Sequence, residues 1–494
     1  MLSPTGVTEL IKKKLYKEWV SERDRLDRID HWYRWTQEEV HIPRSATIEL
    51  KRLRELSKVP WLSLVVTSAA QAMYVDGYRS TLDNVGDVND SPPWRTWMAN
   101  GMDRRQIALH RYALAYGYAF ATVLPGEDPL TGQGQSVIRG VSPRKMFALW
   151  DDPAEDDWPQ YALRILDRSG DDILARLYDD TAVHNLRIGT DGEATYLDEP
   201  EVHDAGVCPV VRFANMLDLD GRTPGEVEPF IAIAARINKT AYDRMMVQHF
   251  NSWKVRYIAG MAAPDGDEAD IQRKKLQLRQ DDLLVAEDEN TKFGVLDGTD
   301  LGGFIQAHRA DVETLAAASQ TPTHELTGQM ANLSAEALAA ARASLNQKVT
   351  ERQKSAGASH AQALRLAAAL AGYDEYATDV TGRVTWQDME IRSISQAADA
   401  LGKMVQMLGV PPTATWARIP GVEKSDVQEW VRLAERGDPI TQLQMRLAEQ
   451  SAEIEAEAQA EARATQQAAS ARADVEMQSP KPVPGGGQNG RAVR

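Results

Sequence analysis

Apolar positions follow a helical spacing over several stretches between residues 223 and 372. Thr223, Pro224 and Glu226 are residue types that begin a helix, as the cap, the first helical residue and the partner of the cap. The apolar residues that follow share one helical face: Phe230, Ala234, Ile237, Ala241 and Met245. This spacing predicts a helix over 223–252, and a similar pattern predicts a second helix over 303–319.

The segment between these two helices has a different pattern. Residues 253–258 alternate in character and are rich in aromatic and β-branched side chains, and 283–286 and 292–296 are further short apolar runs. Runs of this kind are typical of strands. We therefore predict a small strand-bearing insert over 253–302.

A break follows the second helix. Within residues 320–333, Pro322 and Gly328 would each interrupt a helix. The segment is polar, and only His324 and Glu325 can carry a charge. We therefore predict a loop over 320–333.

A long helix is predicted next, from Ser334 as a cap to Gly372 as the stop. At about 1.5 Å rise per residue it would be roughly 57 Å long. Its apolar stripe is thin: Leu338, Leu345, Val349, Ala356, Ala363 and Leu370, with Arg342, Lys348, Arg352 and Lys354 around it. Such a helix needs cover, either from elsewhere in the chain or from other copies of it.

The chain before residue 223 has a helical part and a β-rich part. Helical spacing predicts helices over about 8–39, 59–75 and 93–120. From 119 to 215 short alternating runs are separated by glycine, proline and aspartate, which predicts a mainly antiparallel β-rich lobe. The chain as a whole is therefore expected to have an α+β fold.

The pattern after the long helix is mostly helical. It predicts a strand over 384–391, a helix over 395–408, and a helix from Ser425 to about Gly437. Residues 439–477 are rich in Ala, Glu, Gln and Arg, which favours a solvated helix. The end of the chain is glycine-rich and is predicted to be flexible.

Composition narrows the class of protein. The 494 residues are 43% hydrophobic and 26% charged, as in soluble globular proteins of about three domains. No apolar run approaches the roughly 20 residues needed to span a bilayer, and no secretion signal is expected. Cys208 is the only cysteine, which excludes an intrachain disulfide and indicates a reducing compartment. The net charge of −16 argues against a protein that grips nucleic acid through its phosphates, but allows one that surrounds DNA without holding it.

Motifs with catalytic chemistry are incomplete. His324-Glu325 begins like a zinc protease motif, but Gly328 stands where the second histidine must be. Residues 218–221 lack the later ligands of a calcium loop, 132–134 are expected to be a hairpin turn, and the acidic run 151–157 to be a solvated loop. No Gly-Lys-Ser or Gly-Lys-Thr is present. We predict no catalytic residue, no cofactor and no metal site.

A series of segments carries a resemblance to a known family. Tyr116-Gly117-Tyr118-Ala119-Phe120 is followed, in order, by Val141-Ser142-Pro143, Trp150-Asp151-Asp152-Pro153, Tyr161-Ala162-Leu163, residues 206–215, residues 226–250 and Ser334-Ala335-Glu336-Ala337-Leu338. This order resembles that of portal proteins from tailed double-stranded DNA bacteriophages, in the style of long-tailed phages of Gram-positive hosts. The similarity covers about residues 5–440.

The resemblance implies a portal-type fold with a helical stem, a long wing helix, a β-rich wing lobe, a small strand-bearing clip and a helical C-terminal crown. The implied regions are a wing over 1–222, stem helices over 223–252 and 303–319, a clip over 253–302, a channel loop over 320–333, the long helix and wing return over 334–394, crown helices over 395–476 and a flexible tail over 477–494.

The resemblance also implies a function without catalysis. Portals form a ring, usually dodecameric, at one capsid vertex of the virion, and are assembled in the host cytoplasm. Double-stranded DNA is packaged and ejected through the ring, which meets the large terminase, head-completion or adaptor proteins, the major capsid protein and scaffolding protein, with no membrane involved. The residues implied to face the DNA channel are Gln320, Thr321, His324, Glu325, Gln329 and Asn332.

Two other classes remain open at this stage. A metal-dependent DNA-processing enzyme would use clustered carboxylates, and a different ring-forming head-tail adaptor would share the assembly but not the role. Images of the purified protein separate the enzyme from the portal, because an enzyme is expected to be a compact monomer or dimer and a portal a ring with a central hole.

Overall fold

The computed structural model describes residues 4–37, 40, 42, 46–83, 91–128, 130–169, 172–252, 256–259, 292–295, 298–328, 335–387, 394–416, 419, 422 and 424–436. The chain divides into two compact units, 1–389 and 390–494, and each is treated separately below. Helices and antiparallel strands occur in separate blocks, which confirms an α+β fold.

The first unit begins with one amphipathic helical stretch. It consists of α1 (Pro4–Leu10), a π-helical turn η1 (Ile11–Leu15) and α2 (Tyr16–Tyr33). The residues that it buries include Ile11, Leu15, Trp19, Leu26 and Ile29. The stretch ends at Tyr33, earlier than the predicted 39, and Trp35 has a left-handed φ of 47°.

The predicted helix over 59–75 is shorter than expected. The structure has α3 (Ile48–Leu56), α4 (Trp61–Ala70) and then a strand, β1 (Val75–Arg79). The Gln106 side chain accepts from Val75 N at 2.7 Å and donates to Val75 O at 3.0 Å. β1 also pairs with β13 (Arg383–Trp386), which confirms the start of the predicted strand over 384–391. Contacts with residues distant in sequence therefore outweigh the helix propensity of this segment. Residues 388–391 of the predicted strand lie outside the described residues.

The predicted helix over 93–120 is wrong in its middle and at its end. It is two helices, α5 (Pro92–Ala99) and α6 (Met102–Tyr116), and strand β2 starts at Tyr118. Between them Asn100 turns away from the helix, donating to Ser136 O at 2.9 Å and accepting from Ile138 N at 2.9 Å. Gly101 follows with a φ of 59°, a conformation that glycine adopts without strain.

The β-rich lobe over 119–215 is confirmed. A three-stranded sheet has the order β10 (Val210–Ala214), β2 (Tyr118–Glu127), β3 (Gly134–Val141). A six-stranded sheet contains β4 (Met146–Leu149), β5 (Tyr161–Ser169), β6 (Asp172–Tyr178), β7 (Ala182–Ile188), β8 (Ala194–Tyr196) and β9 (Glu201–Val202). The pairings are all antiparallel, and Gly132 lies in the predicted hairpin turn between β2 and β3.

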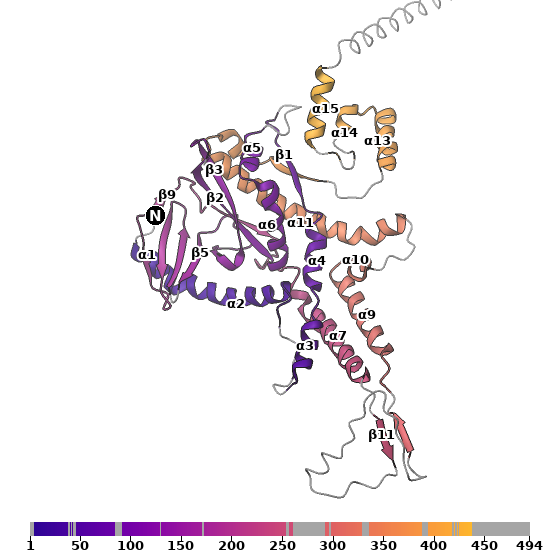
Figure 1. Ribbon diagram of the computed structural model, residues 1–494. Coiled ribbons are helices and arrows are strands. Elements are labelled where there is room, and N and C mark those ends of the chain that lie inside the picture. Colours follow the sequence, from indigo (N-terminus) through magenta and orange to yellow (C-terminus); the bar gives the residue numbers. More distant parts are fainter. Residues whose placement is uncertain are drawn as a thin grey trace, which may run out of the picture. The chain divides into compact units, whose positions relative to one another are not determined.

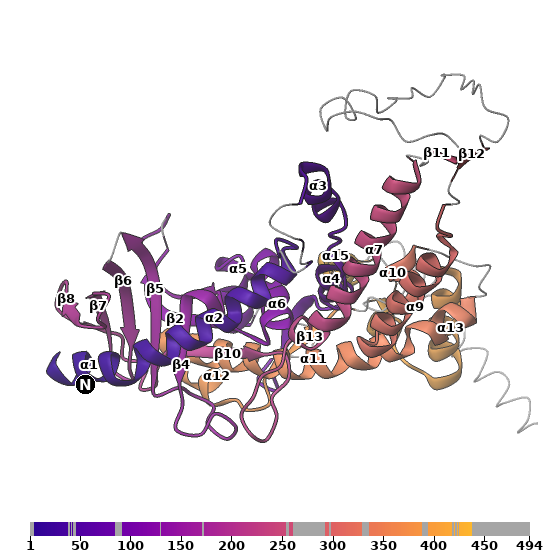
Figure 2. The same ribbon diagram turned by 90° about the horizontal axis from the view of Figure 1, so that it is seen from below.

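A helical hairpin projects from this unit (Figures 1 and 2). Its helices, α7 (Ile231–Ser252) and α9 (Gly302–Ala318), lie side by side, and the paired strands β11 (Arg256–Ala259) and β12 (Lys292–Val295) lie at its far end. These elements confirm the second predicted helix and the first and last strands of the insert. The middle strand, 283–286, lies outside the described residues.

The start of α7 differs from the prediction. Residues 222–227 are not helical, a short 3-10 turn covers Glu228–Phe230, and the α-helix begins at Ile231. Glu226 does not complete a capping box, because its backbone N donates to Leu114 O at 2.7 Å. Instead of forming a helix, this segment crosses the end of α6.

The long helix is confirmed as α11 (Ala335–Leu370), and Gly372 ends it with a φ of 79°. Other elements of the same chain pack against this helix more extensively than its thin apolar stripe predicted. From Leu345 to Ala368 it packs against α5, β2, β3, β10 and β13, and the short helix α12 (Asp374–Thr378) follows it. The described residues before Leu345 are mostly exposed.

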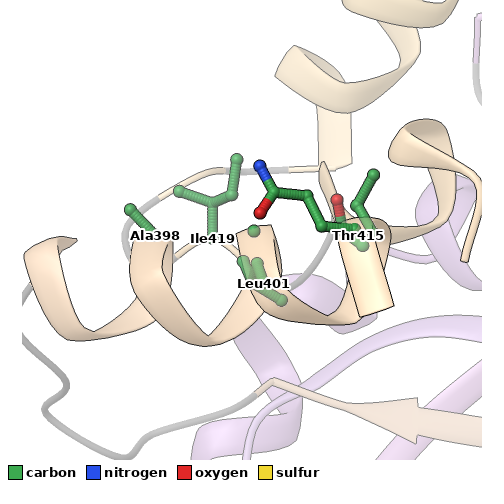
Figure 3. Close-up of a pocket in the computed structure, with 7 residues that line it drawn as sticks. Ala398, Leu401, Thr415 and Ile419 are labelled. Carbon is green, nitrogen blue, oxygen red and sulfur yellow. The ribbon is translucent and has the colours of Figure 1, made fainter. Parts of the chain in front are cut away.

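The second unit contains α13 (Ile394–Leu408), α14 (Pro412–Trp416) and α15 (Lys424–Arg436). α13 confirms the predicted helix, whereas α15 starts before Ser425, so this serine is not its cap. A mainly apolar pocket of about 390 Å³ lies between α13 and α14, with Leu401, Thr415 and Ile419 on its walls (Figure 3). The predicted solvated helix and tail over 439–494 lie outside the described residues.

Candidate DNA-channel segment and its support

A buried group of charges lies beneath the start of the helical hairpin. Glu226 accepts from Arg352 Nε at 3.2 Å and Nη2 at 3.1 Å, and its second oxygen is 3.4 Å from Lys348 Nζ. The side chains of Glu226, Lys348 and Arg352 are 7%, 3% and 10% exposed. Asn215 Nδ2 adds a hydrogen bond to Glu226 at 3.3 Å. We call Glu226, Lys348 and Arg352 the ionic cluster.

Two glycines bring Glu226 to this position. Gly117 ends α6 with a φ of 95°, and a Cβ there would lie 1.9 Å from Thr223 O. At Gly225 a Cβ would lie 2.6 Å from Ala115 O and from Gly117 N. Only glycines permit these two backbones to cross so closely. The crossing therefore places Glu226 against α11.

Lys348 extends the ionic cluster to the end of α9. Its Nζ donates to Ser319 O at 2.7 Å, so a cation meets a carbonyl at the helix C-terminus. Burial lowers the pKa of Lys348, an effect that Glu226 opposes and Arg352 reinforces. This contact fixes the point at which the chain leaves the hairpin.

A second contact with α11 fixes the segment farther on. Residues Thr323–Thr327 form a short helix, α10, between Pro322 and Gly328, so part of the predicted loop is helical. Glu325 accepts from Arg342 Nη2 at 2.7 Å and Nε at 3.2 Å, and Leu326 is buried. Residues 319–328 are thus held on α11 at both ends, by Lys348 and by Arg342.

The candidate channel residues lie in different settings. Gln320 is exposed and has a φ of 54°, and His324 is partly exposed. Thr321 is buried at 4% exposure, and its hydroxyl is 3.0 Å from that of Ser319. Gln329 and Asn332 lie outside the described residues. Among the described candidate residues, Gln320 and His324 therefore offer the accessible side chains, while Thr321 and Glu325 hold the segment in place.

The ionic cluster was not predicted from the sequence. Glu226 was expected in a helix cap, and Lys348 and Arg352 around the apolar stripe of α11, but both cations are buried within that stripe. Their spacing of four residues, in phase with Leu345 and Val349, was a usable signal, because a cation pair on a buried face requires an anion.

A second polar pair is buried under the same helix. His110 on α6 and His360 on α11 are each 1% exposed, with Nε2 atoms 2.8 Å apart, and His110 Nδ1 lies 3.0 Å from Met73 O. Burial lowers the pKa of His110 to about 4, although the Met73 carbonyl opposes the shift. Burial also lowers the pKa of His360, and His110 reinforces this effect. Both rings are therefore neutral at pH 7.

The motifs with possible metal chemistry form turns or loops. Asp218 accepts from the backbone N of Asp220 at 3.0 Å and of Arg222 at 2.8 Å, which makes 218–221 a turn. The described part of 151–157 is largely exposed. Among the described residues there is no group of three or more His, Cys, Asp or Glu side chains placed to hold a metal ion. None of the helices in the described part of the chain is both long and apolar enough to cross a membrane.

A helical hairpin that leads into a segment braced on one long helix is an arrangement suited to a structural protein that assembles with others. The comparison with protein families agrees, since residues 13–464 match the model of the SPP1 Gp6-like phage portal proteins. The chain belongs to this family, whose members are structural components of the bacteriophage head in DNA packaging.

Two curated relatives are portal proteins of mycobacteriophages. The chain is 27% identical over 386 residues to the portal protein of Mycobacterium phage L5, which covers 74% of each chain. It is 26% identical over 379 residues to the portal protein of Mycobacterium phage D29, covering 72% of this chain and 74% of the relative.

Proposed function

We propose that this chain forms the ring at one capsid vertex through which double-stranded DNA is packaged and ejected. The family match over residues 13–464 is the observation that carries this proposal. The ring is a dodecamer, as is usual for such proteins. It acts without catalysis, as a passage for the DNA.

We assign regions of the proposed portal along the chain. The wing comprises 1–222 and part of the return after α11, and the stem comprises 223–252 and 303–319, the segments of α7 and α9. The insert 253–302, with β11 and β12, is the clip, and the helices of 395–476 form the crown. We propose that the clip docks the large terminase during packaging and head-completion or adaptor proteins afterwards, while the wing meets major capsid protein and scaffolding protein. Assembly takes place in the host cytoplasm and the ring remains in the virion.

We propose that residues 320–333 face the DNA, and their support on α11 agrees with this role. Gln320 and His324 are the accessible candidate side chains in the described part. Because Lys348 and Arg342 fix the segment to a rigid helix, it can present neutral groups to DNA without closing on it. The net charge of −16 agrees with a wall that DNA slides past, since tight phosphate binding would slow its passage.

A lysine substitution tests the channel segment. We expect Gln320→Lys, combined with Gln329→Lys and Asn332→Lys, to slow packaging or trap DNA, because each copy in the ring adds cations that bind phosphate. The measurement is the amount of DNA protected from nuclease in a packaging assay with assembled proheads. Gln133→Lys, at an exposed turn between β2 and β3, is the matched control. Packaging by the triple variant at the wild-type rate would contradict a channel-facing segment.

A further inference from the structure

A positively charged groove lies in the first unit, beside α2 and next to strands β4 and β5. It has a volume of about 380 Å³, and Trp19 and Ile165 contribute apolar walls. Its basic lining residues are Arg23, Arg34, Arg144, Lys145 and Arg168, against the acidic Asp27 and Asp167. In a chain with a net charge of −16, this is a local reversal of sign. We call it the basic groove.

Some of these cations are neutralised within the chain and others are not. Arg144 pairs with Asp27 at 2.7 Å and with Asp30 at 2.9 Å, and Arg34 also pairs with Asp30. Lys145 and Arg168 are exposed, and neither forms an ion pair with any residue that the structure describes. The Arg168 guanidinium lies 5.0 Å from the centre of the Trp19 ring. The groove therefore offers unpaired positive charge next to an aromatic surface.

Two loops elsewhere in the same unit have the complementary character. Residues 151–157 and 216–221 contact one another, since a Cβ on Gly221 would come within 2.5 Å of Pro153 Cγ. Together they expose Leu219, which is 97% accessible, and the carboxylates of Asp151, Asp152, Glu155 and Asp157. Asp218 and Asp220, on the second loop, are paired with Arg222. We call these two loops the acidic knob.

The acidic knob is held in a defined shape. Asp152 Oδ1 accepts from Ala154 N at 2.8 Å, and Gln362 Nε2 on α11 donates to Asp157 O at 2.9 Å. Arg212 Nη2 donates to Pro153 O at 2.7 Å. The carboxylates of Glu155 and Asp157 have no ion pair within the described chain. They can therefore pair with an outside cation without disturbing the loop.

The register of β4 and β5 separates the groove from the knob. Met146 lies opposite Arg164, and Leu149 opposite Tyr161, so the groove residues Lys145 and Arg168 lie toward one end of this strand pair and the knob follows the other. The four residues of β4 alone span about 13 Å at the usual rise. The two surfaces carry opposite charges, and each also exposes apolar side chains. Within one chain they lie apart.

We propose that the acidic knob of one copy of this chain binds in the basic groove of the next copy. This inference rests on the ring proposed above. A contact between two different surfaces of identical chains is head-to-tail, and such contacts form a ring when the rotation between copies closes and a filament when it does not. The closed ring proposed above requires the first case. A DNA duplex is too wide for a groove of this volume, which favours an acidic protein loop as the occupant. Leu219 would contact the apolar walls, and Glu155 and Asp157 would pair with Lys145 and Arg168.

Charge reversal on each side tests the contact. The groove variant is Lys145→Glu with Arg168→Glu, and the knob variant is Glu155→Lys with Asp157→Lys; neither pair makes an ion pair inside the described chain. We expect each variant alone to form at least about tenfold fewer rings, because like charges then face each other at every interface. An equal mixture should restore rings with alternating copies, since each reversed surface then meets its complement. Ring fractions are measured by sedimentation velocity and checked by negative-stain images.

Lys14→Glu with Lys17→Glu is the matched control, because both lysines are exposed and neither lines the groove. Circular dichroism is used to check that each variant is folded. The inference is overturned if the wild type and both variants form rings equally well, or if the mixture fails to recover. It is also overturned if the groove variant assembles normally but loses binding to a short duplex or an acidic peptide. A folded wild type that forms no ring overturns the proposed function itself, and this inference with it.

Discussion

The body of α11 and the α7–α9 hairpin are both helical, but different interactions hold them. From Leu345 onward α11 is enclosed by sheets and helices of its own chain, with the ionic cluster and the His110–His360 pair buried beneath it. The hairpin is buried only near its base, and farther out Phe250 and Ile305 are 58% and 54% exposed. The difference shows that α11 is covered within its own chain, whereas the outer hairpin is not; in the proposed ring, neighbouring copies would cover the hairpin.

Breaking the ionic cluster should have the largest effect. We expect Glu226→Ala to lower the free energy of unfolding by about 4 kcal/mol, because Lys348 and Arg352 would remain buried without their anion. Urea denaturation followed by circular dichroism measures the change. Glu228→Ala is the matched control. Its carboxylate pairs with Arg25 in a partly exposed position, and Arg25 keeps Glu22 as a second partner, so we expect a loss of about 1 kcal/mol. Equal losses for the two variants would contradict the special role of the cluster.

The histidine pair should make the body of α11 sensitive to acid. The pKa of His110 is about 4 in the folded chain and about 6.5 when unfolded, so the unfolded state binds a proton first as the pH falls. The contribution of His110 to the free energy of unfolding is therefore complete above about pH 6.5 and is lost as the pH falls toward 4. Between pH 7 and pH 5 the loss from His110 alone is about 2 kcal/mol. Urea midpoints across this range measure the decline.

His110→Gln is the comparison variant for the acid effect, because its amide can still donate to Met73 O without titrating. We expect a shallower pH dependence than in the wild type, whatever the variant's stability at pH 7. The same slope in both proteins would show that other groups cause the acid sensitivity.

The ion pair across the hairpin should contribute less. Arg236 Nε on α7 lies 2.8 Å from Asp311 on α9; the arginine side chain is 55% exposed and the aspartate 16%. Because solvent screens the arginine and an asparagine oxygen can still accept from Thr240, Asp311→Asn should cost about 1 kcal/mol in thermal or urea unfolding. A loss similar to that of Glu226→Ala would mean that the hairpin is held as firmly as α11.

An exposed aromatic on the hairpin should have the smallest effect within one chain. Phe250→Asp is expected to change the unfolding free energy of the monomer by less than about 0.5 kcal/mol, since the side chain is 58% exposed. The same variant should reduce the fraction of protein in rings, as measured by sedimentation velocity. A clear loss of monomer stability with no effect on assembly would reverse the comparison between the hairpin and α11.

The sequence predicted long periodic helices and strands better than it predicted the places where two distant backbone segments cross. The length of α11 and its end at Gly372 followed from pattern and capping, and the strands of the β-rich lobe followed from alternation. The start of α7 did not, because the close approach of Gly117 and Gly225 depends on residues more than 100 positions apart in the chain. The break at Asn100 likewise depends on strand β3.

The candidate site was predictable only in outline. The polar break over 320–333 is visible in the sequence, and its role came from a family resemblance. Its support was not visible, because Lys348 and Ser319 meet only after the chain has returned along α11. Partners distant in sequence leave no local pattern.

Imaging of the purified wild-type chain tests the central claim most directly. Class averages from electron microscopy should show closed rings of identical subunits around an axial hole wide enough for a DNA duplex. A folded protein that remains a monomer or dimer, or that assembles without such a hole, would contradict the account.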